Sequence, residues 1–136
     1  MKECKETITV FNSYLDEAGL DAYSPTVIDG VSWYSEVVSN VDSGGLIAAN
    51  RYSIRIPVDA DFSDKEYVAP ADFSRETVDG HFTLKQGDLI IHGIVTDAEG
   101  ITPADLAEKY GEVVTILGVT DNRERPHGKH WKVTGK

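Results

Sequence analysis

Four histidines and a group of closely spaced carboxylates are the residues of this 136-residue chain whose types could do chemistry. His127 and His130 lie three residues apart, a spacing found between zinc ligands. Asp59, Asp61 and Asp64 could offer oxygen ligands to Ca²⁺. No further ligand accompanies the histidines, and the aspartates lack the glycine and closing glutamate of an EF-hand. We therefore expect no metal site and no cofactor, with cation binding by the acidic loop left open.

The sequence offers no pattern for nucleophilic catalysis, which needs a nucleophile beside an oriented base. No serine stands in a G-x-S-x-G elbow, and Gly44-Gly45 does not lead into the Lys-Ser/Thr of a phosphate-binding loop. His92 lies in an apolar run, where a solvent-facing or hydrogen-bonded strand position is the more ordinary role. The single cysteine, Cys4, cannot form an internal disulfide. These observations favour a protein that is not an enzyme.

Charge is unevenly distributed along the chain, which has 13 basic and 23 acidic side chains and a net charge of −10. Residues 121–136 hold five basic and two acidic side chains, a balance of +3 that leaves −13 for residues 1–120. Phosphate binding needs a basic surface, so we expect no sequence-specific nucleic acid partner. No apolar run reaches the roughly 20 residues of a membrane span. We expect one domain over 1–136, without a signal peptide and away from membranes.

Alternating β-branched and apolar residues predict most of the elements. The expected strands are 7–11, 23–28, 31–38, 50–56, 81–85, 88–95, 112–120 and 130–134. Asp29-Gly30 predicts a hairpin turn, and Gln86-Gly87 predicts a second one. Ser43-Gly44-Gly45 breaks the pattern between the third and fourth strands.

One short helix is expected at about 102–110. Thr102 is placed to cap its N-terminus, Pro103 occupies the first helical position and Gly111 ends it. Short strands with a single helix predict a mainly β fold. We expect a small β-barrel or sandwich of about seven strands, with the helix covering one end.

Two segments are candidate interaction surfaces. The first is a long acidic loop at about 57–80. We expect it to be either a functional excursion or a segment ordered by a neighbour, since loops of this length without structure are uncommon in compact domains. The second is the basic loop 121–129 of a closing C-terminal hairpin; a solvated hairpin tip is the alternative for this loop, and core packing for Trp131. The candidate interface residues are Asp121, Asn122, Arg123, Arg125, His127, Lys129, His130, Trp131, Phe62, Tyr67 and Phe73.

Several phrases of the sequence resemble a family of short proteins encoded in phages and prophages of Gram-positive gut bacteria. The D-N-R…H-W-K-V ending and the G-V-S-W phrase are the most specific parts, and the resemblance spans nearly the whole chain. The layout is similar to that of head-closure or head–tail connector proteins of long-tailed phages. The phrases are Thr7-Ile-Thr-Val-Phe-Asn12, Ser24-Pro-Thr-Val-Ile-Asp-Gly-Val-Ser-Trp-Tyr34, Leu84-Lys-Gln-Gly-Asp-Leu-Ile-Ile-His-Gly93, Val114-Thr-Ile-Leu-Gly-Val-Thr-Asp-Asn-Arg123 and His130-Trp-Lys-Val133.

The resemblance implies a structural protein that acts in virion assembly at the head–tail junction, without catalytic residues. It implies neighbouring connector or tail rings as partners, and a homo-oligomeric ring in the virion that can be a monomer in isolation. The expected location is the virion and, during assembly, the host bacterial cytoplasm. A tail terminator or a minor tail or capsid protein is the alternative within this class. A small-ligand-binding barrel or an unrecognised hydrolase is the alternative from another class.

Overall fold

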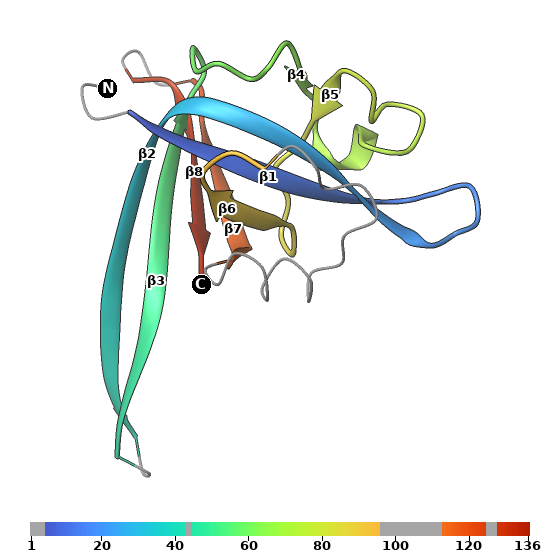
Figure 1. The fold of residues 1–136 in the computed structure, drawn as a ribbon. Coiled ribbons are helices and arrows are strands. Elements are labelled where there is room, and N and C mark those ends of the chain that lie inside the picture. The colour runs from blue at the N-terminus through green and yellow to red at the C-terminus, as the bar shows by residue number, and fades with distance from the viewer. Residues whose placement is uncertain (1–4, 43–44, 96–112, 125–127) are drawn as a thin grey trace.

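A computed structural model describes residues 5–42, 45–95, 113–124 and 128–136 (Figure 1). Its framework is a closed antiparallel barrel with the strand order β1–β2–β3–β8–β7–β6, in which β6 returns to β1. The expected mainly β barrel is confirmed, with six strands in the barrel and not about seven. The barrel strands are β1 (Glu6–Leu15), β2 (Asp21–Asp42), β3 (Gly45–Pro57), β6 (Leu89–His92), β7 (Val113–Asn122) and β8 (His130–Gly135).

Three short elements lie outside the barrel, between β3 and β6. β4 (Glu66–Tyr67) and β5 (His81–Phe82) form a parallel pair, and η1 (Pro70–Asp72) is one turn of 3₁₀ helix. The helix expected at about 102–110 lies outside the described residues. Among the described residues, no helix has the length and apolar character that crossing a membrane would require.

The interior of the barrel is filled by its own side chains. Alternation along each strand turns every second residue inward, so that Tyr52, Ile54 and Ile56 of β3 are buried while Arg51 and Arg55 are exposed. Burying an aliphatic or aromatic side chain contributes about 1.5–3 kcal/mol each, so this cluster is the main stabilising feature. Its other buried members are Ile8, Val10, Ile28, Val31, Phe82, Leu84, Ile90, Val114, Ile116, Trp131 and Val133.

β2 is a single strand where the sequence predicted two strands and a turn, so the hairpin expected at Asp29-Gly30 is wrong. The register slips there, because Glu6 pairs with Val31 and Thr7 with Asp29, which leaves one extra residue in β2. Gly30 has a φ of 94°, which glycine adopts at little cost. The result is a β-bulge. β2 pairs with β1 before the bulge and with β3 after it.

The hairpin expected around Gln86-Gly87 is also wrong, because its two flanks join different sheets. β5 pairs with β4, whereas β6 pairs with β1 and β7. The cause lies at Thr83, whose backbone N–H donates to Asn12 Oδ1 at 3.1 Å and whose carbonyl accepts from Asn12 Nδ2 at 2.7 Å. A buried side chain thus satisfies the backbone groups that a partner strand would have satisfied.

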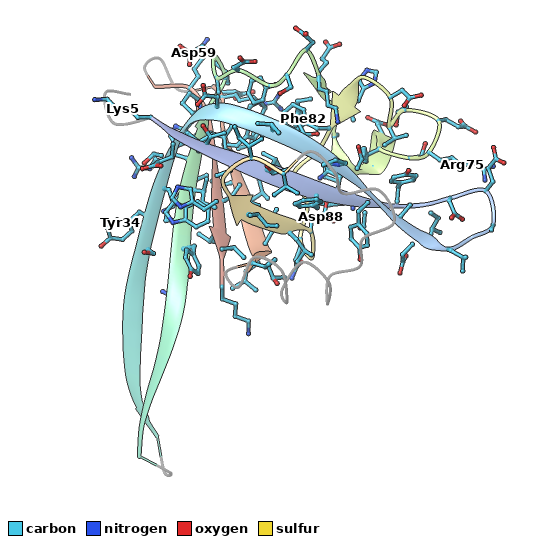
Figure 2. The ribbon with its side chains drawn as sticks, viewed as in Figure 1. Lys5, Tyr34, Asp59, Arg75, Phe82 and Asp88 are labelled. Atoms are coloured by element: carbon cyan, nitrogen blue, oxygen red, sulfur yellow. The ribbon has the colours of Figure 1, made fainter. Side chains whose placement is uncertain are left out.

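A buried carboxylate closes the barrel. Asp88, which is 1% exposed, directly precedes β6 and lies inside the fold (Figure 2). Its oxygens accept from Asn12 Nδ2 at 2.9 Å and from Ser13 Oγ at 2.9 Å, both on β1, and from Lys85 Nζ at 2.9 Å. A buried charge is tolerable when it is paired and fully hydrogen-bonded. The network therefore fixes the start of β6 against β1.

We expect Asp88→Ala to lower the free energy of unfolding by about 3 kcal/mol, because it removes the buried counter-charge of the Lys85 ammonium and an acceptor shared by Asn12 and Ser13. Urea denaturation followed by tryptophan fluorescence measures the change. Asp72→Ala removes an exposed carboxylate of η1 and is the matched control, with an expected change below about 0.5 kcal/mol. Equal effects of the two substitutions would contradict the role assigned to Asp88.

Candidate functional site: interaction surfaces of the barrel

The predicted C-terminal hairpin is confirmed, with β7 paired to β8 and Asn122 opposite His130 at its end. Trp131 is 4% exposed and belongs to the barrel core. Of the two roles expected for it, core packing and an interface anchor, the structure therefore agrees with core packing. Its indole Nε1 is buried without a hydrogen-bond partner in the described structure. The hairpin therefore anchors its end in the barrel.

Arg123 lies over this end and is held from two sides. Its guanidinium donates to both carboxylate oxygens of Asp121, with Nε at 2.9 and 3.0 Å and Nη2 at 2.7 Å. The same guanidinium stands 5.1 Å from the ring centre of Tyr67 and 5.2 Å from that of Trp131, within the range of a cation–π contact. Its charge is thus engaged within the chain.

Phe62 and Tyr67 fasten the segment 57–80 to the same end of the barrel. Phe62 stacks on Phe82 at 5.0 Å between ring centres, and Tyr67 lies 4.7 Å from Trp131. We call Phe62, Tyr67, Phe82, Arg123 and Trp131 the aromatic–arginine cluster. It gathers four of the residues that the sequence nominated for an interface.

These contacts show that residues of the chain itself order the segment 57–80, which corrects the alternative that a neighbour orders it. The segment contains β4 and η1. Its backbone bonds within itself, from Glu66 N to Gly80 O at 2.9 Å, and to the following strand, from Val68 N to Phe82 O at 3.0 Å. Its aromatic residues were the signal in the sequence, because scattered rings in an acidic stretch can serve as anchors.

The pairing of Asp121 with Arg123 shifts the pKa of both groups. Hydrogen bonds from Arg123 hold the pKa of Asp121 below its usual value, and the bond to Asp121 raises the pKa of Arg123. A depressed carboxyl pKa contributes stability above the unfolded-state pKa, and that stability is lost as the pH falls through the folded-state value. Both side chains are nearly half exposed, so solvent keeps this contribution small. Burial raises the pKa of Tyr67.

The remaining nominated residues do not join the cluster. Phe73 packs edge-on against Tyr14 with the ring centres 6.4 Å apart, in another part of the molecule. His130 is buried, with Nδ1 2.6 Å from the Gly128 carbonyl oxygen and Nε2 3.3 Å from Asn122 Nδ2. Lys129 is exposed. Arg125 and His127 lie outside the described residues. Within the described ranges, no three His, Cys, Asp or Glu residues are placed to hold a metal ion.

His92 has the hydrogen-bonded, solvent-facing strand position that the sequence predicted. Its ring stacks on Trp33 with 4.4 Å between centres and an angle of 10°, and Nε2 lies 2.9 Å from Glu6 Oε2. Strand pairing brings these residues together from β1, β2 and β6, so no local spacing in the sequence could reveal the contact.

A two-stranded arm extends beyond the barrel, and the sequence did not predict it (Figure 1). It consists of residues 36–42 of β2 and 45–51 of β3, paired from Glu36 opposite Arg51 to Asp42 opposite Gly45. β8 pairs with β3 only from Tyr52 onward. In the described part of the chain, both outer edges of the arm therefore carry backbone groups that no strand covers. Ser43 and Gly44, where the sequence predicted a break in the strand pattern, lie outside the described residues, and on either side of them Asp42 pairs with Gly45.

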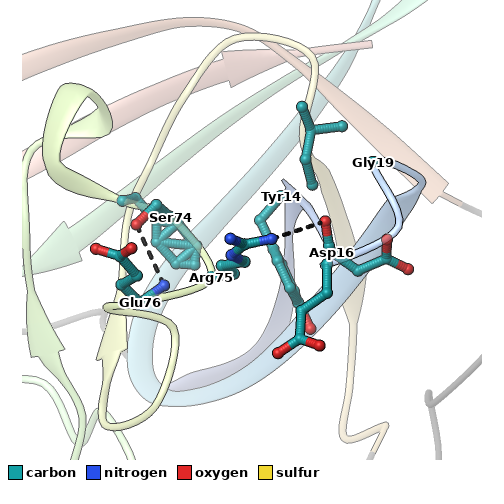
Figure 3. A pocket seen from close by; sticks show the side chains of 9 residues that line it. Tyr14, Asp16, Gly19, Ser74, Arg75 and Glu76 are labelled. Atoms are coloured by element: carbon teal, nitrogen blue, oxygen red, sulfur yellow. Dashed lines mark hydrogen bonds between the residues drawn. The ribbon is translucent and has the colours of Figure 1, made fainter.

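A surface cavity of about 760 Å³ lies between the end of the β1–β2 hairpin and the segment 73–76 (Figure 3). Tyr14 and Phe73 contribute aromatic surface to it, and Arg75 Nη1 reaches the Asp16 carbonyl oxygen at 3.5 Å. Neither His92 nor the aspartates at 59–64 line it. Its full lining is Tyr14, Leu15, Asp16, Glu17, Gly19, Phe73, Ser74, Arg75 and Glu76.

We expect Arg123→Ala to lower the free energy of unfolding by about 1 kcal/mol, since it removes both a bidentate ion pair and the cation over two rings. Urea denaturation measures this loss, and a change in tryptophan emission reports the altered contact on Trp131. Arg75→Ala removes an exposed arginine with a single long hydrogen bond and should leave stability nearly unchanged. An Arg123→Ala variant with unchanged free energy of unfolding would show that the cluster holds without its cation.

Comparison with known proteins gives a family and no activity. No curated protein and no solved structure matches the chain. A family match extends over residues 3–136, which is nearly the full length. The chain therefore belongs to DUF6751, a family of unknown function.

Proposed function

We propose that this chain is a structural protein of a phage or prophage that acts in virion assembly at the head–tail junction, by contact and not by catalysis. The observation that carries the proposal is the arm. In the described structure its strands pair only with each other, so it contributes little to closing the barrel. A ribbon with two open edges is suited to strand addition or packing on a neighbouring chain.

The filled barrel is a second support. Its core residues occupy the interior, and the large cavity lies outside the barrel wall. A barrel of this kind is a rigid base from which an arm and a hairpin end reach other proteins. The resemblance of the sequence to small phage proteins favours head closure among the roles in this class. A tail terminator and a minor tail or capsid protein remain the alternatives.

A small-ligand-binding protein is the second candidate, and the cavity is the observation that favours it. A volume of about 760 Å³ lies within the range of known ligand pockets. The cavity lies at the hairpin end, however, and the barrel interior, where a ligand-binding barrel holds its ligand, is filled by the chain's own side chains. We therefore rank this candidate below the assembly protein.

Deletion of the gene from an inducible prophage tests the proposal. We expect the wild-type protein in purified particles by mass spectrometry. Without it, electron microscopy should show filled heads and separate tails of normal length. Tails of uncontrolled length would assign the chain to tail termination instead. Normal infectious particles from the deletion strain would overturn the proposal.

An armless variant tests the role of the arm in the same strain. Residues 36–51 are replaced by Asn-Gly, because Ser35 and Tyr52 are paired and a two-residue turn can join them. We expect the variant to keep the thermal unfolding of the wild type and to fail to restore particle assembly. Full complementation by a folded armless chain would show that the arm has no part in assembly.

A further inference from the structure

Two like charges stand opposite each other on the outer face of the barrel. Arg55 of β3 and Lys132 of β8 are direct partners across the strands. Their chain neighbours Ile54, Trp131 and Val133 are buried, so alternation turns Arg55 and Lys132 outward. Like charges directly opposite each other destabilise a sheet. Among the side chains that the structure describes, no ion pair involves Arg55 or Lys132, although the chain carries a net charge of −10.

An exposed aromatic ring adjoins this pair. Tyr34 of β2 is 58% exposed, points away from the barrel (Figure 2) and lies opposite Ser53. Ser53 is two residues from Arg55 on the same face of β3. We call Tyr34, Arg55 and Lys132 the basic face. A tyrosine beside cations, in a sheet surface that the described chain leaves uncovered, has the composition of a protein-binding surface.

The end of the β1–β2 hairpin has the complementary character. Leu15 and Leu20 are 60% and 65% exposed there. Glu17 and Glu76 are exposed and line the adjoining cavity. We call these four residues the acidic tip. The tip and β3 lie on opposite sides of the molecule in Figure 1, so one chain cannot bring them together without disrupting the barrel.

We propose that the acidic tip of one copy docks on the basic face of a second copy. The glutamates would meet Arg55 and Lys132, and the leucines would pack on Tyr34. Because the two surfaces differ, the contact is heterologous and repeats head to tail, which generates a ring when the rotation closes. This inference rests on the proposed function, since it names the surfaces by which the copies of an assembly ring would meet.

Complementary charge reversal tests the contact. Variant A carries Arg55→Glu and Lys132→Glu, and variant B carries Glu17→Lys and Glu76→Lys. Each alone places like charges across the contact, so we expect self-association to weaken roughly 100-fold or more. In an equimolar mixture every contact between A and B again joins opposite charges, so association should return. Sedimentation velocity at low salt, over a range of concentrations, measures all three samples beside the wild type.

Matched controls separate this contact from a general effect of charge. Asp59→Lys with Glu66→Lys reverses two exposed acidic residues elsewhere, and Lys5→Glu with Lys129→Glu reverses two exposed basic residues. Both controls should associate as the wild type does. Thermal unfolding confirms that all variants are folded, so loss of association cannot be loss of structure.

Three results would overturn the inference. They are a wild-type chain that stays monomeric at its highest soluble concentration, a mixture of A and B that associates no better than either alone, and binding of duplex DNA that only variant A loses. The virion experiment is read separately. If the protein is found in virions but the mixture of A and B does not associate, the contact is refuted and the proposed function stands. If the mixture associates but the protein is absent from virions, the proposed function is refuted and the contact stands.

Discussion

The fold depends on the buried carboxylate of Asp88. β6 has only four residues, yet it must pair with β1 on one side and β7 on the other to close the barrel. So short a strand gains few ladder hydrogen bonds, and the donors from Asn12, Ser13 and Lys85 add the fixed point that it needs. The charge is tolerable because Lys85 supplies the opposite charge and Asn12 and Ser13 donate hydrogen bonds to the carboxylate. Closure then lets the apolar residues of six strands share one core.

The same network also positions the surface features. Ser13 adjoins Tyr14, which packs on Phe73, and the Lys85 ammonium lies 5.9 Å from the Phe73 ring centre. Tyr14 and Phe73, which line the cavity between the β1–β2 hairpin and the segment 73–76, are thus held next to the network that closes the barrel. At the other end, the aromatic–arginine cluster fastens the segment 57–80 over β8. The barrel therefore presents ordered surfaces, and the arm extends from it as a two-stranded ribbon.

Strand patterns predicted the class of fold and the C-terminal hairpin, because alternation over 113–122 and 130–135 is local information. They failed where distant residues decide the outcome. Asp29-Gly30 has the composition of a turn, but pairing of Asp29 with both Thr7 and Asp61 keeps the strand running through a bulge. Gln86-Gly87 does form a turn, but the Asn12 side chain hydrogen-bonds to the backbone of Thr83, so the residues before the turn do not pair with β6. Of the nominated interface residues, the aromatic anchors and Arg123 meet inside the chain, since ring and cation contacts depend on the fold and not on spacing.

β2 forms a mechanical connection between distant parts of the molecule. One covalent strand of 22 residues runs from the β1–β2 hairpin end, through the bulge at Gly30, into the arm. Hydrogen bonds in an antiparallel ladder lie across the strands. A pull along β2 consequently loads its bonds to β1 and β3 together in shear, and they cannot open one at a time as in a peeled hairpin. A load on the arm is thereby carried along one covalent strand to the hairpin end on the far side of the barrel.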